Sequence, residues 1–256
     1  MRIPPFYSID MPHLPNSRQV SLAVETSGRI GSVALGIGDS LVAQADLSGF
    51  RRHSSELLVV VSDLLGRHRL QPQDISRIYI PKGPGSFTGI RIAVTFAKMA
   101  AFAIAAKIAA IDTLEALAEN ATSVIQNKTA DIRRLATILD AKRGLFYIAV
   151  FDWLNDHFQR KSDDLLITAD DFLGRFCSQG VPVHLLGEGL LYYQKQFEHP
   201  NTVILDKALW PARAESVWRL GQKLAAEGRF EDPYTLVPLY IRRPEAEESI
   251  EKKRLV

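Results

Sequence analysis

The stretch "SLAVETSGRIGSVALG" (residues 21–36) has a pattern that returns in "ATILDAKRGLFYIAVF" (136–151). In both, an apolar run ends in a carboxylate, a polar turn containing a glycine follows, and a second apolar run comes after it. Two such runs joined by a short turn predict a β-hairpin. Because Glu25 and Asp140 hold equivalent places, the sequence predicts two halves that share one plan.

Strand and helix patterns alternate around the two hairpins. In the first half they predict strands at 20–27, 31–38, 41–47 and 75–81, helices at 53–68 and 88–106, and a strand followed by a helix at 107–120. In the second half they predict two strands within 134–153, a helix at 163–180, a strand within 181–190, a helix at 209–230 and a strand-like run from residue 233. Two-lobed nucleotide-binding folds of the actin and sugar-kinase type are built from two such halves. We therefore expect an α/β chain with a two-lobed, actin-like (ribonuclease H-like) fold, in which each lobe has a sheet with helices.

The expected organisation has four segments. They are a loose extension at 1–19, an N-terminal lobe at 20–112, a C-terminal lobe at 113–208, and a C-terminal helix and tail at 209–256. We expect the late helix to pack back on the N-terminal lobe.

Bulk composition narrows the function classes. The 256 residues carry a net charge of +2, which gives no case for direct nucleic-acid binding. The one cysteine, Cys177, excludes an intramolecular disulfide and suits a reducing cytosol, and we expect it to be a small buried apolar residue. Residues 1–19 contain four prolines and no apolar core, unlike a secretory signal. The long apolar run after Gly89 is broken by charged residues, so we expect a soluble cytoplasmic protein with no membrane partner.

The loop "PKGPGSFTGI" (81–90) is the first candidate site. Gly83, Gly85 and Ser86 precede a helix, and glycine loops at a helix N-terminus can cradle phosphate. Lys82 comes before the glycines rather than after them, so the loop is not a Walker A motif, nor does it match GxGxxG. From the residues alone, the loop either holds an anion or only shapes the turn that starts the helix.

Polar residues at other strand ends are further candidates. Glu25, Thr26 and Ser27 either hold a metal–phosphate pair or close their own turn through hydroxyl groups. Gly187 and Gly189, on either side of Glu188, mark a ligand approach or a tight turn with equal weight. No two of the six histidines are three, four or five residues apart, so the usual ligand spacing of a metal site is absent.

The helix predicted at 88–106 is apolar nearly all round. Arg91, Thr95 and Lys98 form one narrow polar stripe, and the other positions from Ile90 to Ala106 are apolar. Such a helix is buried on more than one side. One side can lie on the sheet, and the other needs a cover from this chain or from a partner.

Several segments together resemble the bacterial TsaB (YeaZ) family, in the glycoprotease-like group of the actin-like ATPase superfamily. They are "LAVETS", "SVALG", "RRHSSELL", "KGPGSFTGIRIAVTFAKMAA", "IDTLEALA", "ILDAKRGLFYIAVF" and "VPLYIRRPEA", in family order. The resemblance implies a protein that helps add threonylcarbamoyl to the tRNA adenosine next to the anticodon. In that family TsaB binds the catalytic paralogue TsaD, the ATPase TsaE joins them, and TsaB alone forms homodimers. Contact with tRNA would be indirect, through the complex.

The resemblance also assigns residues. It implies a partner interface on the helices at 53–68 and 88–106, formed by His53, Leu57, Val60, Val61, Leu64, Ile90, Val94, Ala97, Lys98 and Ala101. A vestigial nucleotide site would comprise Glu25, Thr26, Ser27, Gly83, Gly85, Ser86 and Asp140. No cofactor is required, and weak binding of ATP or ADP with magnesium stays open. By residue type, His53 is otherwise expected to be a solvated helix start.

Departures from the paralogue decide the expected role. Thr113 and Leu117 stand where TsaD-type proteins carry a His-x-x-x-His metal pair, with Glu115 between them. Neither side chain replaces a metal-bound imidazole. We therefore expect no catalytic or metal-binding residues, and a non-catalytic activating subunit that binds TsaD. The alternatives are an ATP-binding or ATP-hydrolysing enzyme that uses Glu25 and Asp140 with magnesium, and a metallopeptidase, against which the missing histidines argue.

Overall fold

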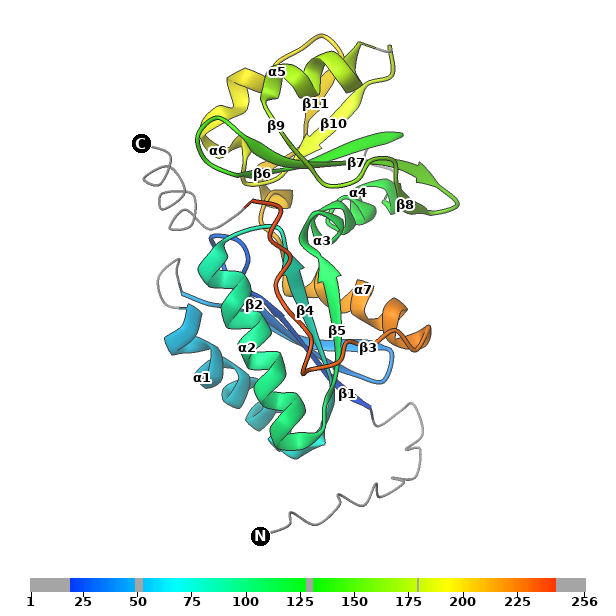
Figure 1. Ribbon diagram of the computed structural model, residues 1–256. Helices are drawn as coiled ribbons and strands as arrows, with labels where there is room; N and C mark the ends of the chain where they lie inside the picture. Colours follow the sequence, from blue (N-terminus) through cyan, green and yellow to red (C-terminus); the bar gives the residue numbers. More distant parts are fainter. Residues whose placement is uncertain (1–18, 49–52, 128–130, 179, 243–256) are drawn as a thin grey trace, which may run out of the picture.

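The computed structural model describes residues 19–48, 53–127, 131–178 and 180–242, which form two lobes, one above the other in Figure 1. The expected extension at 1–19 therefore falls outside the described residues except for Gln19, as does the end of the tail. The first sheet has the strand order β3-β2-β1-β4-β5 and the second the order β11-β10-β6-β7-β8, with β9 paired to β7. The strands are β1 Val20–Glu25, β2 Ser32–Ile37, β3 Ser40–Asp46, β4 Ile75–Gly83, β5 Lys107–Asp112, β6 Arg134–Asp140, β7 Phe146–Leu154, β8 His157–Arg160, β9 Leu165–Ile167, β10 Val183–Leu186 and β11 Thr202–Ile204.

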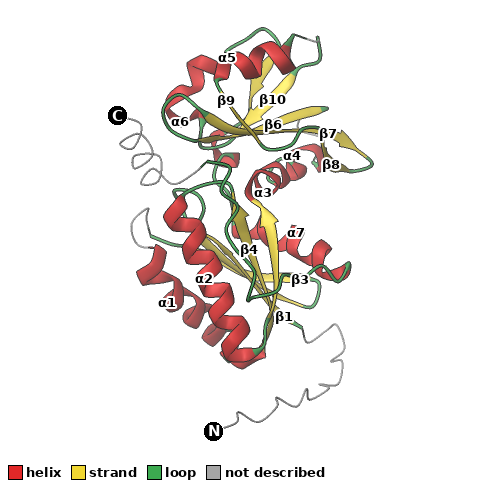
Figure 2. Cartoon of the chain, in the orientation of Figure 1, coloured by secondary structure: helices red, strands yellow, loops and turns green. Residues whose placement is uncertain are grey.

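Helices cover the faces of both sheets (Figure 2). They are α1 His53–Arg67, α2 Phe87–Ile104, α3 Thr113–Glu119, α4 Thr122–Gln126, α5 Ala169–Phe172, α6 Leu190–Tyr193 and α7 Ala214–Ala226. Short 3-10 turns lie at Pro72–Asp74, Gln194–Phe197 and Lys207–Leu209, and a π-type turn extends α5 over Leu173–Cys177.

The two sheets repeat one topology, as the hairpin pattern predicts. In the first sheet, β1 is antiparallel to β2 and parallel to β4, and β4 is parallel to β5. In the second sheet, β6 is antiparallel to β7 and parallel to β10, and β10 is parallel to β11. Glu25 lies opposite Ser32 and Asp140 opposite Phe146, each at the end of its hairpin. The predicted α/β fold and its repeat are thus confirmed.

Side-chain alternation on β1 explains the two layers of the first lobe. Leu22 and Val24 belong to the apolar core under α1 and α2, whereas Ala23 belongs to the core under α7. Successive side chains on a strand point to opposite faces, so one strand serves both cores. Gly221 brings α7 onto the sheet, since a Cβ there would lie 2.3 Å from the ring of Tyr79. The late helix therefore packs on the sheet formed by β1–β5, far from its neighbours in sequence.

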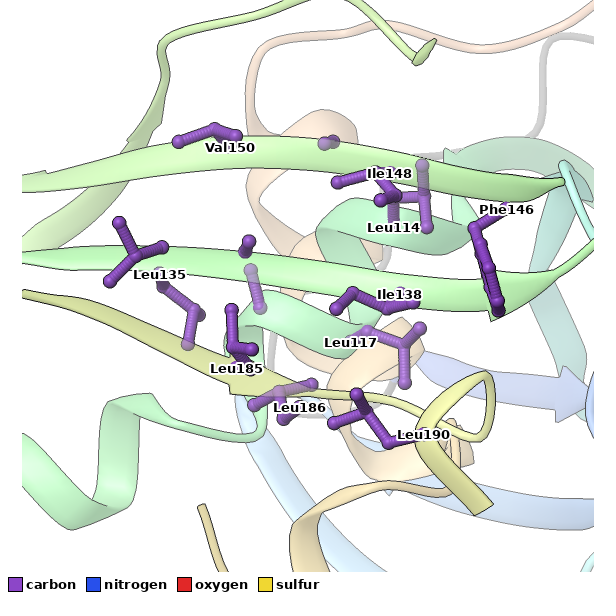
Figure 3. Packing of buried hydrophobic residues seen from close by; sticks show 14 of the residues in the cluster. Leu114, Leu117, Leu135, Ile138, Phe146, Ile148, Val150, Leu185, Leu186 and Leu190 are labelled. Carbon is purple, nitrogen blue, oxygen red and sulfur yellow. The ribbon is translucent and has the colours of Figure 1, made fainter. Parts of the chain in front are cut away.

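The core of the second lobe lies between α3 and the sheet. Figure 3 shows Leu114 and Leu117 of α3 against Ile138 of β6 and Ile148 of β7. All four are fully buried. Cys177 belongs to the same core, and burial raises the pKa of its thiol to about 11, so the expectation of a buried apolar cysteine is confirmed.

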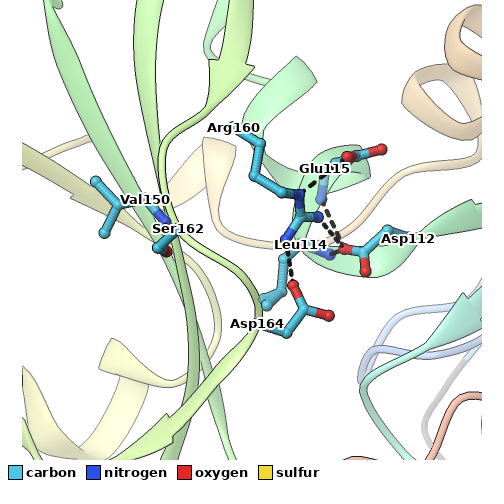
Figure 4. A network of polar contacts seen from close by, with 7 residues as sticks. All are labelled: Asp112, Leu114, Glu115, Val150, Arg160, Ser162 and Asp164. Atoms are coloured by element: carbon cyan, nitrogen blue, oxygen red, sulfur yellow. Dashed lines mark hydrogen bonds and ion pairs between the residues drawn. The ribbon is translucent and has the colours of Figure 1, made fainter.

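An ion-pair cluster ties the end of the first sheet to the second lobe (Figure 4). Arg160 of β8 contacts Asp112 at 3.0 Å, Glu115 at 3.1 Å and Asp164. Asp112 also caps α3 by accepting the backbone N–H of Leu114 at 2.8 Å. Burial raises the pKa of Asp112 to about 7, with the nearby Asp164 adding to the rise and Arg160 opposing it. The single guanidinium therefore holds three acidic groups at the junction of the lobes.

Several predicted elements differ from the structure in the second half. The helix predicted at 163–180 is a short strand, β9, followed by α5 and the π-type turn, because Thr168 caps α5 five residues later than expected. The strand-like run from residue 233 forms no strand within the described part and crosses the first lobe as irregular chain instead. Leu236 of this run is buried in the core that includes α2, and the Leu239 N–H makes a local contact with the Lys82 carbonyl at the end of β4.

Candidate functional site

A cavity of about 580 Å³ lies between the lobes. Its walls come from the β1–β2 turn, the loop before α2, the β6–β7 turn, the loop before α6 and the C-terminal segment. Of the seven predicted nucleotide-site residues, Ser27, Gly85, Ser86 and Asp140 line this cavity. The other three, Glu25, Thr26 and Gly83, are buried and do not line it.

Glu25 closes its own turn rather than reaching the cavity. Its Oε1 accepts hydrogen bonds from the backbone N–H of Ser27 at 2.5 Å and from the Ser27 hydroxyl at 2.6 Å. The residue is fully buried and its Oε2 has no hydrogen-bond partner. Burial raises the pKa of Glu25 to about 7, against the lowering effect of the Ser27 bonds. A carboxyl group in this state is a poor ligand for a cation.

Gly89 in the first half and Gly187 in the second half each lie in close contact with the backbone of a strand or strand end. A Cβ at Gly89 would lie 1.8 Å from the carbonyl oxygen of Thr26, and one at Gly187 would lie 2.2 Å from that of Ile138. The Thr26 hydroxyl also donates to the Gly89 carbonyl at 2.7 Å. Gly187 has φ +124°, a conformation that glycine adopts with little strain. These contacts support the turn interpretation of both glycine loops, because the close approach at these glycines is to the chain itself.

Two carboxylates do line the cavity, and each is engaged by a neighbouring group. Asp140 accepts the Lys142 ammonium at 2.7 Å. Glu188 accepts the backbone N–H of Arg29 at 2.9 Å, and burial raises its pKa. Within the described ranges, no group of three or more His, Cys, Asp or Glu side chains is arranged to hold a metal ion. A magnesium ion that accompanies ATP would therefore compete with Lys142 for Asp140 and with the Arg29 N–H for Glu188. Weak binding of ATP or ADP with magnesium stays a prediction.

The state of Glu25 makes stability depend on pH. Its folded pKa lies above the ordinary value of 4.5, so the folded protein binds the proton more tightly than the unfolded chain. The resulting stabilisation is complete below about pH 4.5 and is lost as pH rises through about 7. Changing Glu25 to glutamine removes this loss, so we expect the variant to gain about 2–3 kcal/mol relative to wild type between pH 5 and pH 8. Thermal melting of both proteins at the two pH values tests this, since other titrating groups are common to both. Equal pH dependence would contradict it.

A second hollow, of about 380 Å³, forms a groove between α1 and α2. Leu58 of α1 and Ile92, Thr95 and Met99 of α2 line it. Leu58 is 56% exposed and Met99 49% exposed. The groove thus exposes apolar side chains of both helices, which makes it a candidate interaction site. By length and composition α2 would also be able to cross a membrane, but here its inner side packs on β4 and β5.

The structure corrects the predicted partner interface. Seven of its ten residues are buried within the first lobe: His53, Leu57, Val61, Leu64, Ile90, Val94 and Ala97. Only Val60, Lys98 and Ala101 are partly exposed. On a helix that is apolar nearly all round, the sequence period does not tell which side meets the sheet. The apolar side chains that are exposed on these helices instead include Leu58 of α1 and Met99 and Phe102 of α2.

His53 differs from both of its predicted roles. It is neither a solvated helix start nor an interface residue, but packs beside Gly31, and burial lowers its pKa. Other residues of the site escaped the sequence analysis altogether. Phe87 and Tyr240 stack with ring centres 5.0 Å apart at the edge of the cavity. The only sequence signal for this contact is the pair of aromatic residues, which carries no periodicity.

Comparison with known proteins gives consistent results. A family model described as TsaD, tRNA N6-adenosine threonylcarbamoyltransferase, matches residues 47–249. The tRNA threonylcarbamoyladenosine biosynthesis protein TsaB of Bacillus subtilis (strain 168) is 30% identical over 228 residues, which cover 88% of this chain and 95% of that protein. TsaB of Escherichia coli (strain K12) is 32% identical over 130 residues, 51% of this chain and 54% of that protein.

Solved structures show the same fold. A protein from Pseudomonas aeruginosa with similarity to peptidase YeaZ superposes with a TM-score of 0.74 at 25% identity, covering 88% of this chain and 100% of its own. YeaZ from Pseudomonas aeruginosa superposes with a TM-score of 0.73 at 24% identity, covering 87% of this chain and 100% of its own.

Proposed function

Since the chain belongs to the TsaB (YeaZ) family of tRNA threonylcarbamoyladenosine biosynthesis proteins, we propose that it is a non-catalytic subunit that activates a TsaD-type threonylcarbamoyltransferase by binding it. The observation that carries the proposal is the exposed apolar groove between α1 and α2. The inner sides of these helices are occupied by the core of their own lobe, whereas the groove side leaves Leu58 and Met99 half exposed. Covering such a surface with a partner removes apolar area from water and favours association.

Two observations support the absence of catalysis by this chain alone. Thr113 and Leu117, which stand at the places of the paralogue's metal ligands, are fully buried against their own lobes. The cavity between the lobes offers carboxylates that are already engaged, as described for Asp140 and Glu188. Thr113 and Leu117 supply no imidazole to hold a metal, and Asp140 and Glu188 are each engaged by a group of this chain.

Reconstitution tests the proposal directly. The purified protein is added to TsaD, TsaE and the enzyme that makes the threonylcarbamoyl adenylate, with unmodified tRNA as substrate. We expect modified adenosine only when all components are present, and none from this protein alone. Full activity of the other components without it would overturn the proposal.

We further propose that the same groove forms a homodimer when no partner is present, and that TsaD displaces the second copy. One surface cannot hold both, so added TsaD should convert the homodimer to a heterodimer at equal stoichiometry. Sedimentation velocity of the mixture measures this. A ternary species that contains two copies of this chain joined through the groove, plus TsaD, would contradict it.

The alternative function, an ATP-using enzyme, is tested by calorimetry. From the engaged carboxylates we expect ATP binding, if measurable, to be weak and not strengthened by magnesium. Tight binding that depends on magnesium, together with turnover by the lone protein, would favour the alternative over the subunit role.

A further inference from the structure

The chain from Glu231 to Arg242, which we call the C-terminal strap, runs along the first lobe toward the second lobe (Figure 1, orange to red). It begins by pairing with the edge strand β5, where the Glu231 N–H donates to the Ile108 carbonyl at 2.8 Å. In its middle, Leu236 is buried under α2, and its carbonyl accepts the Lys98 ammonium at 3.1 Å. The Leu239 N–H then donates to the Lys82 carbonyl at 2.7 Å. The strap is thus fixed to the first lobe along its length.

Gly83 shows how closely the strap lies on the loop before α2. A Cβ at Gly83 would lie 2.4 Å from the carbonyl oxygen of Leu239, and Gly83 has φ +122°. Both facts require glycine at this position. One glycine of the "PKGPGSFTGI" loop therefore makes room for the strap.

The end of the strap joins the two lobes. Tyr240 stacks on Phe87, and its hydroxyl accepts a hydrogen bond from Nε of Arg91 on α2 at 3.0 Å. Two residues later, Arg242 donates to the carbonyl of Ala141 in the β6–β7 turn at 2.7 Å. One end of this short piece is held by the first lobe and the other by the second lobe.

The same piece forms a wall between the cavity and the groove. Phe87 and Thr88 line both hollows, Tyr240 and Arg242 line the cavity, and Arg91 lines the groove. Any molecule seated in the groove beside Arg91 therefore lies next to the residue that holds Tyr240.

We propose that the C-terminal strap is a latch that keeps the two lobes closed, and that a protein docking in the groove releases it. The release follows from the chemistry of Arg91, whose guanidinium donates to a neutral phenol in the free protein. A carboxylate of the docked protein that pairs with the Nε edge of this guanidinium competes with the Tyr240 hydroxyl for the same hydrogen, and its charge-assisted bond is the stronger one. Tyr240 then loses its donor, the strap end loosens, Arg242 leaves the Ala141 carbonyl, and the lobes open. The release step rests on the proposed docking function, whereas the latch itself does not.

Distances between the lobes test the latch in the full chain. Spin labels are placed on cysteines substituted at His68 in the first lobe and at Arg175 in the second, both exposed. Cys177 is buried and its thiol pKa is raised, so it competes little for the label. Arg242→Ala removes the bond from the strap to the Ala141 carbonyl of the second lobe. Arg91→Gln removes the Arg91–Tyr240 bond even when no partner protein is present. We expect both variants to broaden the distance distribution toward longer distances, while the Arg29–Glu188 bond and the Arg160–Asp112 ion pair continue to connect the lobes. Arg229→Ala and Arg67→Gln, at exposed positions outside the strap and the groove, are the matched controls and should leave it unchanged.

Addition of TsaD tests the release. We expect TsaD to shift the distance distribution of the wild type toward that of Arg242→Ala and to leave the distribution of Arg242→Ala unchanged. We also expect TsaD to bind Arg242→Ala severalfold more tightly than it binds the wild type. If the distance distribution of Arg242→Ala equals that of wild type, the latch is overturned. If the distribution of Arg91→Gln equals that of wild type, the role of Tyr240 in release is overturned. Binding of TsaD without any shift overturns the release, whereas failure of TsaD to bind refutes the docking function and leaves the two variants to decide on the latch.

Discussion

Changing Met99 to aspartate should weaken association with TsaD, or with a second copy of the chain, by at least about 100-fold. Met99 lines the groove and is half exposed, so the free protein solvates the new carboxylate at little cost. In the complex the carboxylate would be buried without a partner, which costs several kcal/mol. Thermal melting of the free variant should stay within about 2 °C of wild type, because a single exposed substitution changes stability little.

Two further variants make this result specific to the groove. Ser62→Asp places the same charge on α1 at an exposed position that does not line the groove, and should leave binding unchanged. Ala97→Asp places it at a fully buried position of α2 and should unfold the lobe instead. Sedimentation and circular dichroism separate these outcomes. Normal association of Met99→Asp would show that the groove is not the docking surface.

Changing Gly89 to alanine should destabilise the protein by about 3 kcal/mol or more, which for a chain of this size lowers the Tm by about 10 °C. The added methyl group would lie 1.8 Å from the Thr26 carbonyl oxygen, and neither backbone yields easily. The strand end and α2 would have to separate, and the Thr26–Gly89 hydrogen bond would be lost with them.

Gly66→Ala is the matched control on the neighbouring helix. Gly66 lies near the end of α1 with nothing within 4 Å of an added Cβ. Alanine favours the helix over glycine there, so we expect a gain of about 0.5–1 kcal/mol. Urea unfolding of the two variants gives opposite signs if close packing, and not the alanine itself, is decisive. A mild effect at Gly89 would mean that the strand end moves freely away from α2.

The repeated hairpins were predictable because their signal is local. Each apolar run and its turn lie within sixteen consecutive residues, and the carboxylates Glu25 and Asp140 indeed end their strands. The sequence also predicted that the apolar helix α2 is covered on a second side, because a helix with one polar stripe buries more than one side. The period did not reveal which side meets the sheet, and the residues that the resemblance placed in the partner interface include Val94 and Ala97, which are buried.

The site residues depend on contacts between distant parts of the chain. Whether Glu25 faces a ligand or its own turn is decided by Ser27 and by the burial of the strand end, which spacing does not encode. Tyr240 and Phe87 are 153 residues apart, and Arg242 and Ala141 are 101 apart. Such contacts produce no periodic pattern and no motif in the sequence. The apolar alternation of the strap therefore predicted a strand.

The glycines seated on the strand carbonyls have a consequence for how fast this protein finds its partner. Gly89 and Gly187 fix the walls of both halves with the chain's own backbone, so these walls need no bound nucleotide to take shape. The end of β1 that carries α2 is therefore rigid before any encounter, and ordering it takes no conformational entropy from the free energy of binding. The first encounter at the groove should then form at the ordinary rate for two preformed surfaces, about 10⁵–10⁷ M⁻¹s⁻¹, and the proposed release of the strap follows it as a separate step.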